Sequence, residues 1–487
     1  MEHNIINEKI EYANLTYNFE KVLSVSLILE YIFKFLSRDN IKNLFLCNKK
    51  IYHIYCNQIK KLKISENVEK TNILKLLNKY DSIIDLDVSG CKIINDIKSK
   101  LENLEILNVN NTNISDISFL EKNKNIKKLK LENCKNIKDF TPIYKLEKLE
   151  FLNINSTNIS DISSLVKNKN IKVLKLEDCK NINDFKPISK LEKLEILNVS
   201  STNISDISFL EKNINIKELN LDVYKDMDFS PISKLEKLVI LNILITDISD
   251  ILFLEKNKNI KELKFFYCKN IKDFTPISKL GKLEILNLSG TNISNISFLE
   301  KNKNIKKLYL DDCFKIKDFT PISKLEELEI LYVSNTNISD ISFLEKNKNI
   351  KELKLEDCKK INDFKPISKL ENLEILNVNS TNISDISFLD KNQNIKELNL
   401  NYCYYIIDFT SLFKLEKLEI FGASSTNISD ISFLKNNKNI KELKLTYSHK
   451  IKDFTPISQL ENLEILNVRG TKISDISFSE KIKILKN

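Results

Sequence analysis

The sequence predicts an α/β solenoid, in which short parallel strands stack into one sheet and short helices or turns return the chain on the opposite face. Three observations lead to this prediction. A tetrapeptide recurs at a fixed interval through most of the 487 residues, an apolar frame recurs twice within each interval, and the chain has only 5 glycines. So few glycines indicate that the frequent turns of such a chain are made in another way.

The repeated tetrapeptide is Thr-Asn-Ile-Ser, and its copies lie 45 residues apart, with a single interval of 44 between Thr202 and Thr246. All seven prolines occupy one position of this unit, where Ser411 replaces an expected eighth. Such regularity indicates a structural repeat. The copies begin at Thr112, Thr157, Thr202, Thr291, Thr336, Thr381 and Thr426, with degenerate copies at Thr246 and Thr471.

Each unit divides into two related halves. The frame L-x-x-L-x-V-x-x-T-x-I-x-x-I, which begins at Leu104, recurs 22 residues later as I-x-x-L-x-L-x-x-C, which begins at Ile126. Leu107 and Val109 place two apolar side chains on one face of a short strand, with Asn108 on the other. This frame resembles the leucine-rich repeat, which implies about 18 coils over residues 61–487 with a parallel sheet on the concave face.

The return segments carry helix-start signals. In the second half of a unit, Thr141-Pro142 predicts an N-cap followed by proline at the first helical position, where no amide donor is needed. In the first half, Ser115-Asp116 is expected to cap in the same way. These segments are expected to replace glycine-based turns.

Seven of the nine cysteines occupy one position of the repeat frame. Equivalent positions two coils apart should lie roughly 10 Å from each other, beyond the approximately 7 Å that a disulfide can bridge between two Cα atoms. We therefore expect buried free thiols, no disulfide ladder and, without clustered histidines, no metal site. The seven are Cys91, Cys134, Cys179, Cys268, Cys313, Cys358 and Cys403.

A segment with helical periodicity, residues 24–60, follows an N-terminal extension of residues 1–23. It contains the run I-L-x-x-I-F-x-F-L-S-x-D-N-I-x-x-L-x-L-C, from Ile28 to Cys47, and its apolar spacing predicts three short helices. This run resembles an F-box. The residues that would contact the partner of that motif are Ile28, Leu29, Ile32, Phe33, Leu36, Ile41 and Leu44. The alternative is a plain cap that shields the first coil, as every solenoid needs.

The order of an F-box followed by leucine-rich repeats resembles the F-box/leucine-rich repeat proteins of large DNA viruses of amoebae or of AT-rich protists. The resemblance implies a substrate-recognition adaptor of a cullin ubiquitin ligase. Its helices would dock on a Skp-type linker subunit, and its solenoid would hold a target protein. The alternative function is a scaffold or inhibitor with no link to a ligase.

Departures from the repeat at exposed strand positions are the best sequence clue to where a target binds. Most coils place Asn, Lys or Glu there, but several place aromatic residues, which are favoured anchors of protein interfaces. Neutral drift within a repeat array is the alternative explanation. We expect the target-binding residues to be Phe266, Tyr267, Tyr309, Tyr332, Tyr402 and Tyr447.

The remaining features exclude several classes of function. His3, His53 and His449 have no evident catalytic partners, and the glycines are scattered, so neither an enzyme nor a cofactor is expected. The charge of +9 comes from interleaved residues, and lysines such as Lys130 lie beside acids such as Glu132, which disfavours a nucleic-acid surface. With no membrane-length apolar run and no signal-peptide pattern, we expect an intracellular, cytoplasmic monomer, in the host cytoplasm if the source is viral.

Overall fold

A computed structural model describes residues 60–64, 83–92, 102–222, 227–473 and 483–485. The chain divides into two compact units, Met1–Asp222 and Val223–Asn487. The N-terminal extension and all of the F-box-like segment except Lys60 lie outside the described residues, so its expected helices stay a prediction.

The first unit contains one continuous parallel sheet. Each strand pairs with the next along the chain, and the buried leucines of neighbouring strands lie directly opposite each other. Its strands are β1 (Lys61–Lys63), β2 (Asp85–Asp87), β3 (Ile106–Asn108), β4 (Lys128–Lys130), β5 (Phe151–Asn153), β6 (Val173–Lys175), β7 (Ile196–Asn198) and β8 (Glu218–Asp222).

The second unit contains a sheet of the same kind, in which β9 to β20 pair successively and in parallel. Its strands are β9 (Ile240–Leu244), β10 (Glu262–Lys264), β11 (Ile285–Asn287), β12 (Lys307–Tyr309), β13 (Ile330–Tyr332), β14 (Glu352–Lys354), β15 (Ile375–Asn377), β16 (Glu397–Asn399), β17 (Ile420–Gly422), β18 (Glu442–Lys444), β19 (Ile465–Asn467) and β20 (Lys483–Leu485).

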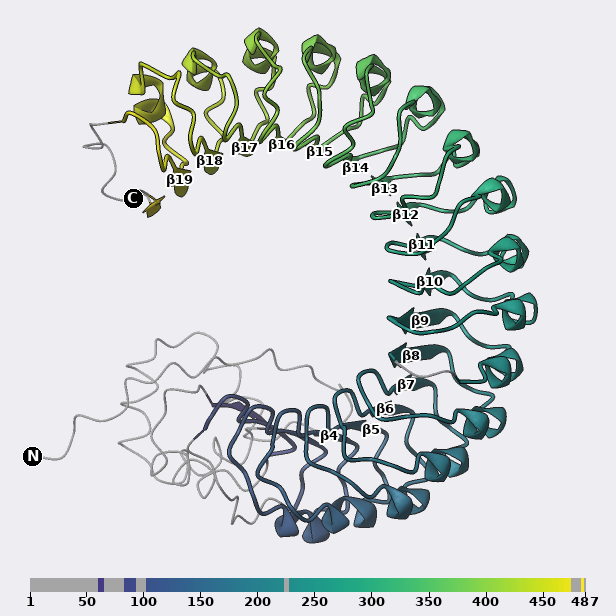
Figure 1. The fold of residues 1–487 in the computed structure, drawn as a ribbon. Coiled ribbons are helices and arrows are strands. Elements are labelled where there is room, and N and C mark those ends of the chain that lie inside the picture. The colour runs from purple at the N-terminus through teal and green to yellow at the C-terminus, as the bar shows by residue number, and fades with distance from the viewer. Residues whose placement is uncertain (1–59, 65–82, 93–101, 223–226, 474–482, 486–487) are drawn as a thin grey trace, which may run out of the picture. The chain divides into compact units, whose positions relative to one another are not determined.

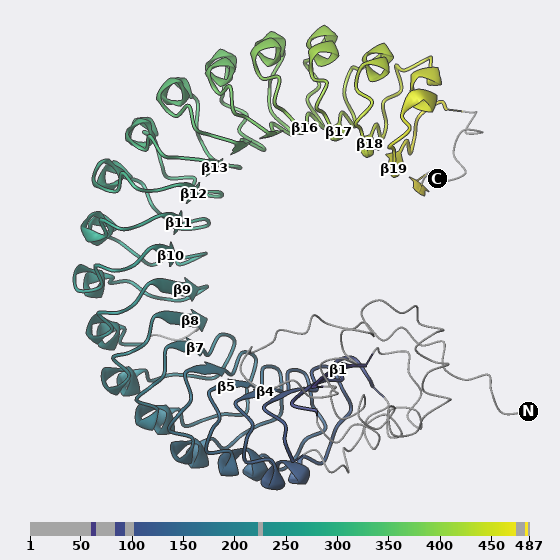
Figure 2. The same cartoon turned by 180° about the vertical axis from the view of Figure 1, so that it is seen from behind.

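The return segments are short 3₁₀ helices, which line the opposite side of each unit from the strands (Figures 1 and 2). Those of the first unit are η1 (Ser118–Lys122), η2 (Thr141–Lys145), η3 (Ser163–Lys167), η4 (Lys186–Lys190) and η5 (Ser208–Lys212). Those of the second are η6 (Ser230–Lys234), η7 (Leu252–Glu255), η8 (Thr275–Lys279), η9 (Ser297–Lys301), η10 (Thr320–Lys324), η11 (Ser342–Lys346), η12 (Lys365–Lys369), η13 (Ser387–Lys391), η14 (Thr410–Lys414), η15 (Ser432–Lys435) and η16 (Thr455–Gln459).

The caps of these helices differ in part from the expectation. Asp116 does act as expected, because its carboxylate accepts the backbone N–H of Ser118 at 2.8 Å. In the second half of the unit, however, Thr141 makes no side-chain cap, and Asp139 accepts the N–H of Thr141 at 2.9 Å. The acidic residue two positions before the helix therefore caps both halves, while Pro142 starts the helix as predicted.

The turns after the strands explain the scarcity of glycine. Among the described residues, fourteen that are not glycine adopt a positive φ, mostly Asn, Ser and Asp, each in the turn after a strand. Asn, Asp and Ser tolerate this left-handed conformation better than most side chains because they can hydrogen-bond locally. Glycine fills the same place only at Gly90, Gly290 and Gly470.

Two rows of buried polar residues join successive coils. The seven frame cysteines are buried free thiols, as predicted, and Cys134 Sγ donates to the carbonyl of Val109 at 3.0 Å. A second row, which sequence reasoning missed, consists of buried asparagines. In that row Asn168 Nδ2 donates to two carbonyls of the preceding coil, those of Ile143 and Leu146. Both rows make each coil depend on its neighbour for hydrogen bonding.

Candidate functional site

The outward face of the sheet offers two side-chain positions per coil. The middle residue of each strand is buried, whereas the first and third are half-buried and lie on the other face. In the second unit the third positions usually hold Lys or Asn, and the parallel register places Asn287, Tyr309, Tyr332 and Lys354 side by side. Tyr309 and Tyr332 thus occupy the strand positions that the sequence predicts.

These two tyrosines form a compact cluster with the next coil. Their rings meet edge to face, with centroids 4.9 Å apart and planes 86° apart. Tyr332 Oη donates a hydrogen bond to Glu352, and Lys354 Nζ lies 4.1 Å from the centroid of the Tyr332 ring. Glu352 and Lys354 are also joined by an ion pair of 3.3 Å. The four side chains form a fixed aromatic surface with charged groups at one end.

The environment of the cluster shifts its proton equilibria. Burial, together with the hydrogen bond to Glu352, raises the pKa of Tyr332 to about 12. Burial also raises the pKa of Tyr309. For Lys354 burial acts to lower the pKa, but the interactions with Tyr332 and Glu352 outweigh it and raise the pKa overall. Both hydroxyls and the ammonium group therefore keep their protons at neutral pH and can serve as hydrogen-bond donors.

The other four expected residues do not lie on strands. Phe266, Tyr267, Tyr402 and Tyr447 lie two or three residues beyond the strand ends, and the three tyrosines have φ of 56° to 57°. The prediction of strand positions was wrong for them because β10, β16 and β18 each have only three residues before the chain turns. In each coil a second buried residue, such as Phe265, follows the buried residue of the strand. We call the two residues that come directly after this second buried residue the turn row. In neighbouring coils this row continues the backbone ladder, as in the bond from Tyr267 N–H to the Ser289 carbonyl at 2.9 Å.

Tyr267 spans three successive coils of the turn row. Its ring lies across Gly290, where an added Cβ would come within 2.7 to 2.9 Å of three ring carbons. Its hydroxyl then donates to Asp312 Oδ2 at 2.9 Å, and Phe266 packs edge-on against the ring with centroids 4.6 Å apart. Gly290 is thus glycine for two reasons, since its φ is +74° and the ring covers it.

The same arrangement recurs near the end of the second unit, where the ring of Tyr447 would collide with a Cβ on Gly470. Tyr402, by contrast, is followed in the row by Ser425. These residues therefore do not form one cluster with Tyr309 and Tyr332. The six expected aromatics separate into a strand-face pair, a turn-row pair after β10 and two tyrosines, Tyr402 and Tyr447, that lie apart from the other expected residues.

Sequence reasoning missed further exposed apolar residues. Leu244, which is half-buried, ends β9, and the exposed Ile245 follows it, so the two take the places of the turn row in this coil. The Ile245 N–H donates to the Phe266 carbonyl at 2.8 Å. The signal that could have found them was available, since most sibling repeats carry Asn or Ser at both places. A second exposed group lies in the coil after β16 and comprises Tyr404, Tyr405, Ile407 and Phe413.

The acidic partners expected for the strand lysines have other contacts. The carboxylate of Glu132 accepts hydrogen bonds from the side-chain amides of Asn110 and Asn153, at 3.2 and 3.0 Å. Glu177 is bound in the same way by Asn155 and Asn198. In the turn row, carboxylates are thus satisfied by neutral donors of adjacent coils.

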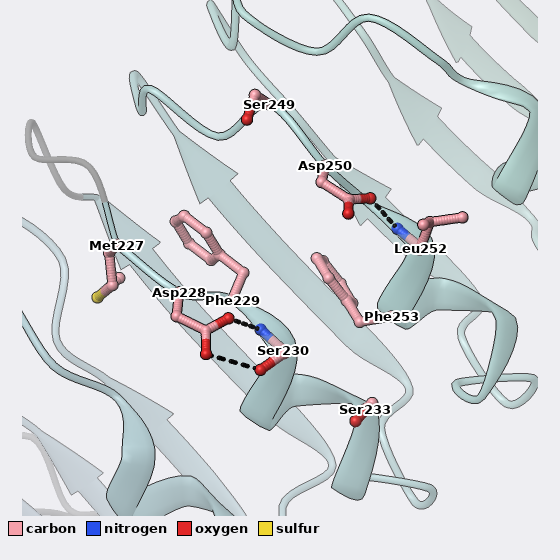
Figure 3. Close-up of a pocket in the computed structure, with 9 residues that line it drawn as sticks. All are labelled: Met227, Asp228, Phe229, Ser230, Ser233, Ser249, Asp250, Leu252 and Phe253. Atoms are coloured by element: carbon pink, nitrogen blue, oxygen red, sulfur yellow. Dashed lines mark hydrogen bonds between the residues drawn. The ribbon is translucent and has the colours of Figure 1, made fainter.

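A hollow lies between the coils of η6 and η7 in the second unit. Figure 3 shows the rings of Phe229 and Phe253 side by side at its centre. Its two carboxylates are engaged in helix caps, because Asp228 accepts from Ser230 N–H and Asp250 from Leu252 N–H, both at 2.8 Å. The two carboxylates of the hollow therefore stabilise the starts of η6 and η7. They are not a pair of groups arranged for acid–base chemistry.

The described residues do not form a metal site or a membrane span. Within the described residues, no group of three or more His, Cys, Asp or Glu side chains could hold a metal ion. In the same part of the chain, none of the helices has the length and apolarity needed to cross a membrane. The thiols are poor nucleophiles, since burial raises the pKa of Cys313 to about 11.

Comparisons with known proteins agree with this architecture. A family model described as Leucine Rich repeats (2 copies) matches residues 281–324 and 326–369. A comparison with curated proteins found no match.

Solved structures show the same fold at low sequence identity. An LRR protein of Leptospira interrogans is 18% identical, with a TM-score of 0.54, over 87% of this chain and 99% of that one. TLR13, solved in complex with ssRNA13, is 19% identical, with a TM-score of 0.58, over 87% and 70%. Internalin InlF of Listeria monocytogenes is 24% identical, with a TM-score of 0.47, over 73% and 89%. The first two likenesses concern the fold alone.

Proposed function

We propose that this chain is a non-enzymatic protein-interaction module whose second unit holds a target protein on the strand face around Tyr309 and Tyr332. The observation that supports this most directly is the cluster of these two rings with Glu352 and Lys354. Aromatic side chains bury a large area with few torsions to order, so they are efficient interface anchors. Here the ordering cost is reduced further, because each ring is already held by a neighbour.

The polar groups of the cluster favour a protein target. An aromatic anchor that is flanked by one carboxylate and one ammonium group can bind apolar side chains and backbone amides together. Because Tyr309 and Tyr332 occupy the same frame position of neighbouring coils, they lie in cross-strand register and form one continuous surface. A single contact with a target can therefore use both rings.

The test is capture of targets from the native cell with the full-length chain as bait. Replacement of Tyr309 and Tyr332 by Ser should abolish capture, while thermal stability changes little because both side chains are only half-buried. The matched control is Lys444→Ser, which alters the same strand position in β18, several coils away. Capture that persists in the double variant would refute the assignment of this site.

For the first 60 residues, we propose the adaptor role that the F-box-like run implies, with a Skp-type linker subunit as partner. The chain would then work inside the cell, in the cytoplasm, as a monomeric link between a ubiquitin ligase and the target. The alternative is a leucine-rich repeat scaffold or inhibitor, with residues 24–60 serving only as a solenoid cap.

A pull-down distinguishes these two proposals. The full-length chain should recover a Skp-type subunit, and replacement of Ile32 and Leu36 by Asp should abolish its recovery. Tyr309→Ser/Tyr332→Ser should retain the subunit while losing the target. If the unaltered chain recovers targets but no Skp-type subunit, the scaffold proposal takes precedence.

A further inference from the structure

The turn row of the second unit contains an apolar surface that is separate from the strand-face cluster. It consists of Leu244, Ile245, Phe266 and Tyr267, which we call the apolar seat. The last three are 43%, 36% and 36% exposed. At the same places the two coils that follow carry Ser289, Gly290, Asp311 and Asp312. In two adjacent coils, four large apolar residues thus stand at places that hold mostly polar residues or glycine in the other coils.

Ile245 shows that this surface is maintained at a cost. Its φ is 52°, and a β-branched residue in the left-handed region is strained by crowding between the side chain and the backbone. Most other residues at this place are Asn, Ser, Asp or Gly, which adopt the conformation more easily. Strained backbone that carries an exposed apolar side chain is typical of binding sites.

Two carboxylates lie next to the seat along the row. Asp312 accepts the hydroxyl of Tyr267, and Asp311 Oδ1 accepts the N–H of Ser334 at 2.9 Å. The groups that donate hydrogen bonds to these two carboxylates are uncharged, and among the residues that the structure describes neither carboxylate has an ion pair. Burial raises the pKa of Asp311, as expected for a carboxylate without a cation beside it.

We propose that the apolar seat and Asp311 together bind an extended peptide segment with a large apolar residue and, three residues away, a lysine or arginine. Phe266 and Asp311 are two coils apart in the same row, or about 10 Å at roughly 4.8 Å per strand. An extended chain advances about 3.3 Å per residue, so three residues span the same distance. The apolar residue packs on Phe266 and Tyr267, and the cation pairs with Asp311 and Asp312.

This site is distinct from the strand-face cluster, and its test is independent of the proposed function. A random 12-residue peptide library on phage is selected on the full-length chain. The expected result is enrichment of peptides with a large apolar residue three positions from Lys or Arg, in either order. The best peptide, made synthetically, should bind about tenfold or more weakly to Phe266→Ser and to Asp311→Asn.

Two matched variants control for general damage. Glu356→Gln alters a carboxylate at the place of Asp311 in a coil further along the row, and Phe314→Ser removes an exposed ring outside the row. Both should bind the peptide as the unaltered chain does, and circular dichroism should show all four variants folded. An absence of enrichment, enrichment without the apolar–basic pair, or equal binding by Asp311→Asn or Phe266→Ser would overturn the proposal. Peptide binding that survives Tyr309→Ser/Tyr332→Ser would confirm that the two sites are separate.

Discussion

The contact between Tyr267 and Gly290 gives a quantitative test of how the turn row is held. In Gly290→Ala the new Cβ would lie 2.7 to 2.9 Å from three carbons of the tyrosine ring, so the ring must move. The backbone at φ +74° costs an alanine about 1 kcal/mol. Displacing the ring should also break its bond to Asp312, worth about 1 kcal/mol at this half-exposed site. The expected loss in free energy of unfolding is therefore about 2 kcal/mol.

A double-mutant cycle separates these two contributions. With Tyr267→Ala already present, Gly290→Ala should cost only the backbone part of about 1 kcal/mol, which leaves a coupling energy of about 1 kcal/mol. Urea unfolding followed by circular dichroism measures each corner of the cycle. Gly281→Ala is the control, because nothing lies within 4 Å of its added Cβ and no positive φ is involved. Equal costs of Gly290→Ala in both backgrounds would show that the ring does not cover the glycine.

Two further predictions concern groups with shifted pKa. Iodoacetamide at pH 8 should leave Cys313 unmodified in the folded chain and label it only after unfolding, as peptide mass mapping would show, because its pKa is raised to about 11. The capping hydrogen bond from Thr320 lowers the pKa of Asp318, so this carboxylate stabilises the fold above the usual Asp range and loses that effect as the pH falls below about 4. Asp318→Ala should lower stability by about 1 kcal/mol at pH 7 and much less at pH 2, as thermal unfolding would reveal, and an equal loss at both values would contradict the capping role.

Much of the fold could be predicted because each coil repeats one solution to the same packing problem. The interval of 45 residues, the alternation around Leu107 and the frame cysteines together indicate a parallel stack with buried thiols. The cap at Asp139 was missed because an aspartate two residues before the helix and a threonine at its start are both plausible caps in a sequence. Only the coordinates show that the carboxylate reaches the free N–H.

The candidate site was harder to predict, since it depends on where each strand ends. A repeat frame shows which residues are buried, but the change from strand to turn occurs within two residues of Lys264 and moves Phe266 off the strand face. The contact of Tyr267 with Asp312 joins residues 45 positions apart and follows from the pitch of the stack. A local sequence pattern shows neither where the strand ends nor which residues two coils apart come into contact.

The regularity of the chain also indicates where specificity must lie. A position that is identical in every coil gives the same surface everywhere, so it cannot distinguish one part of a target from another. Specific binding therefore has to depend on coils that depart from the repeat, and in the second unit two such departures lie between β9 and β13: the apolar seat and the Tyr309–Tyr332 pair. The apolar seat depends on two unusual features of the backbone. Ile245 adopts a positive φ, and the neighbouring coil has a glycine, Gly290, beneath the ring of Tyr267. A strained isoleucine with its side chain in solvent costs stability in the free chain, and a bound segment that packs on this side chain would offset that cost.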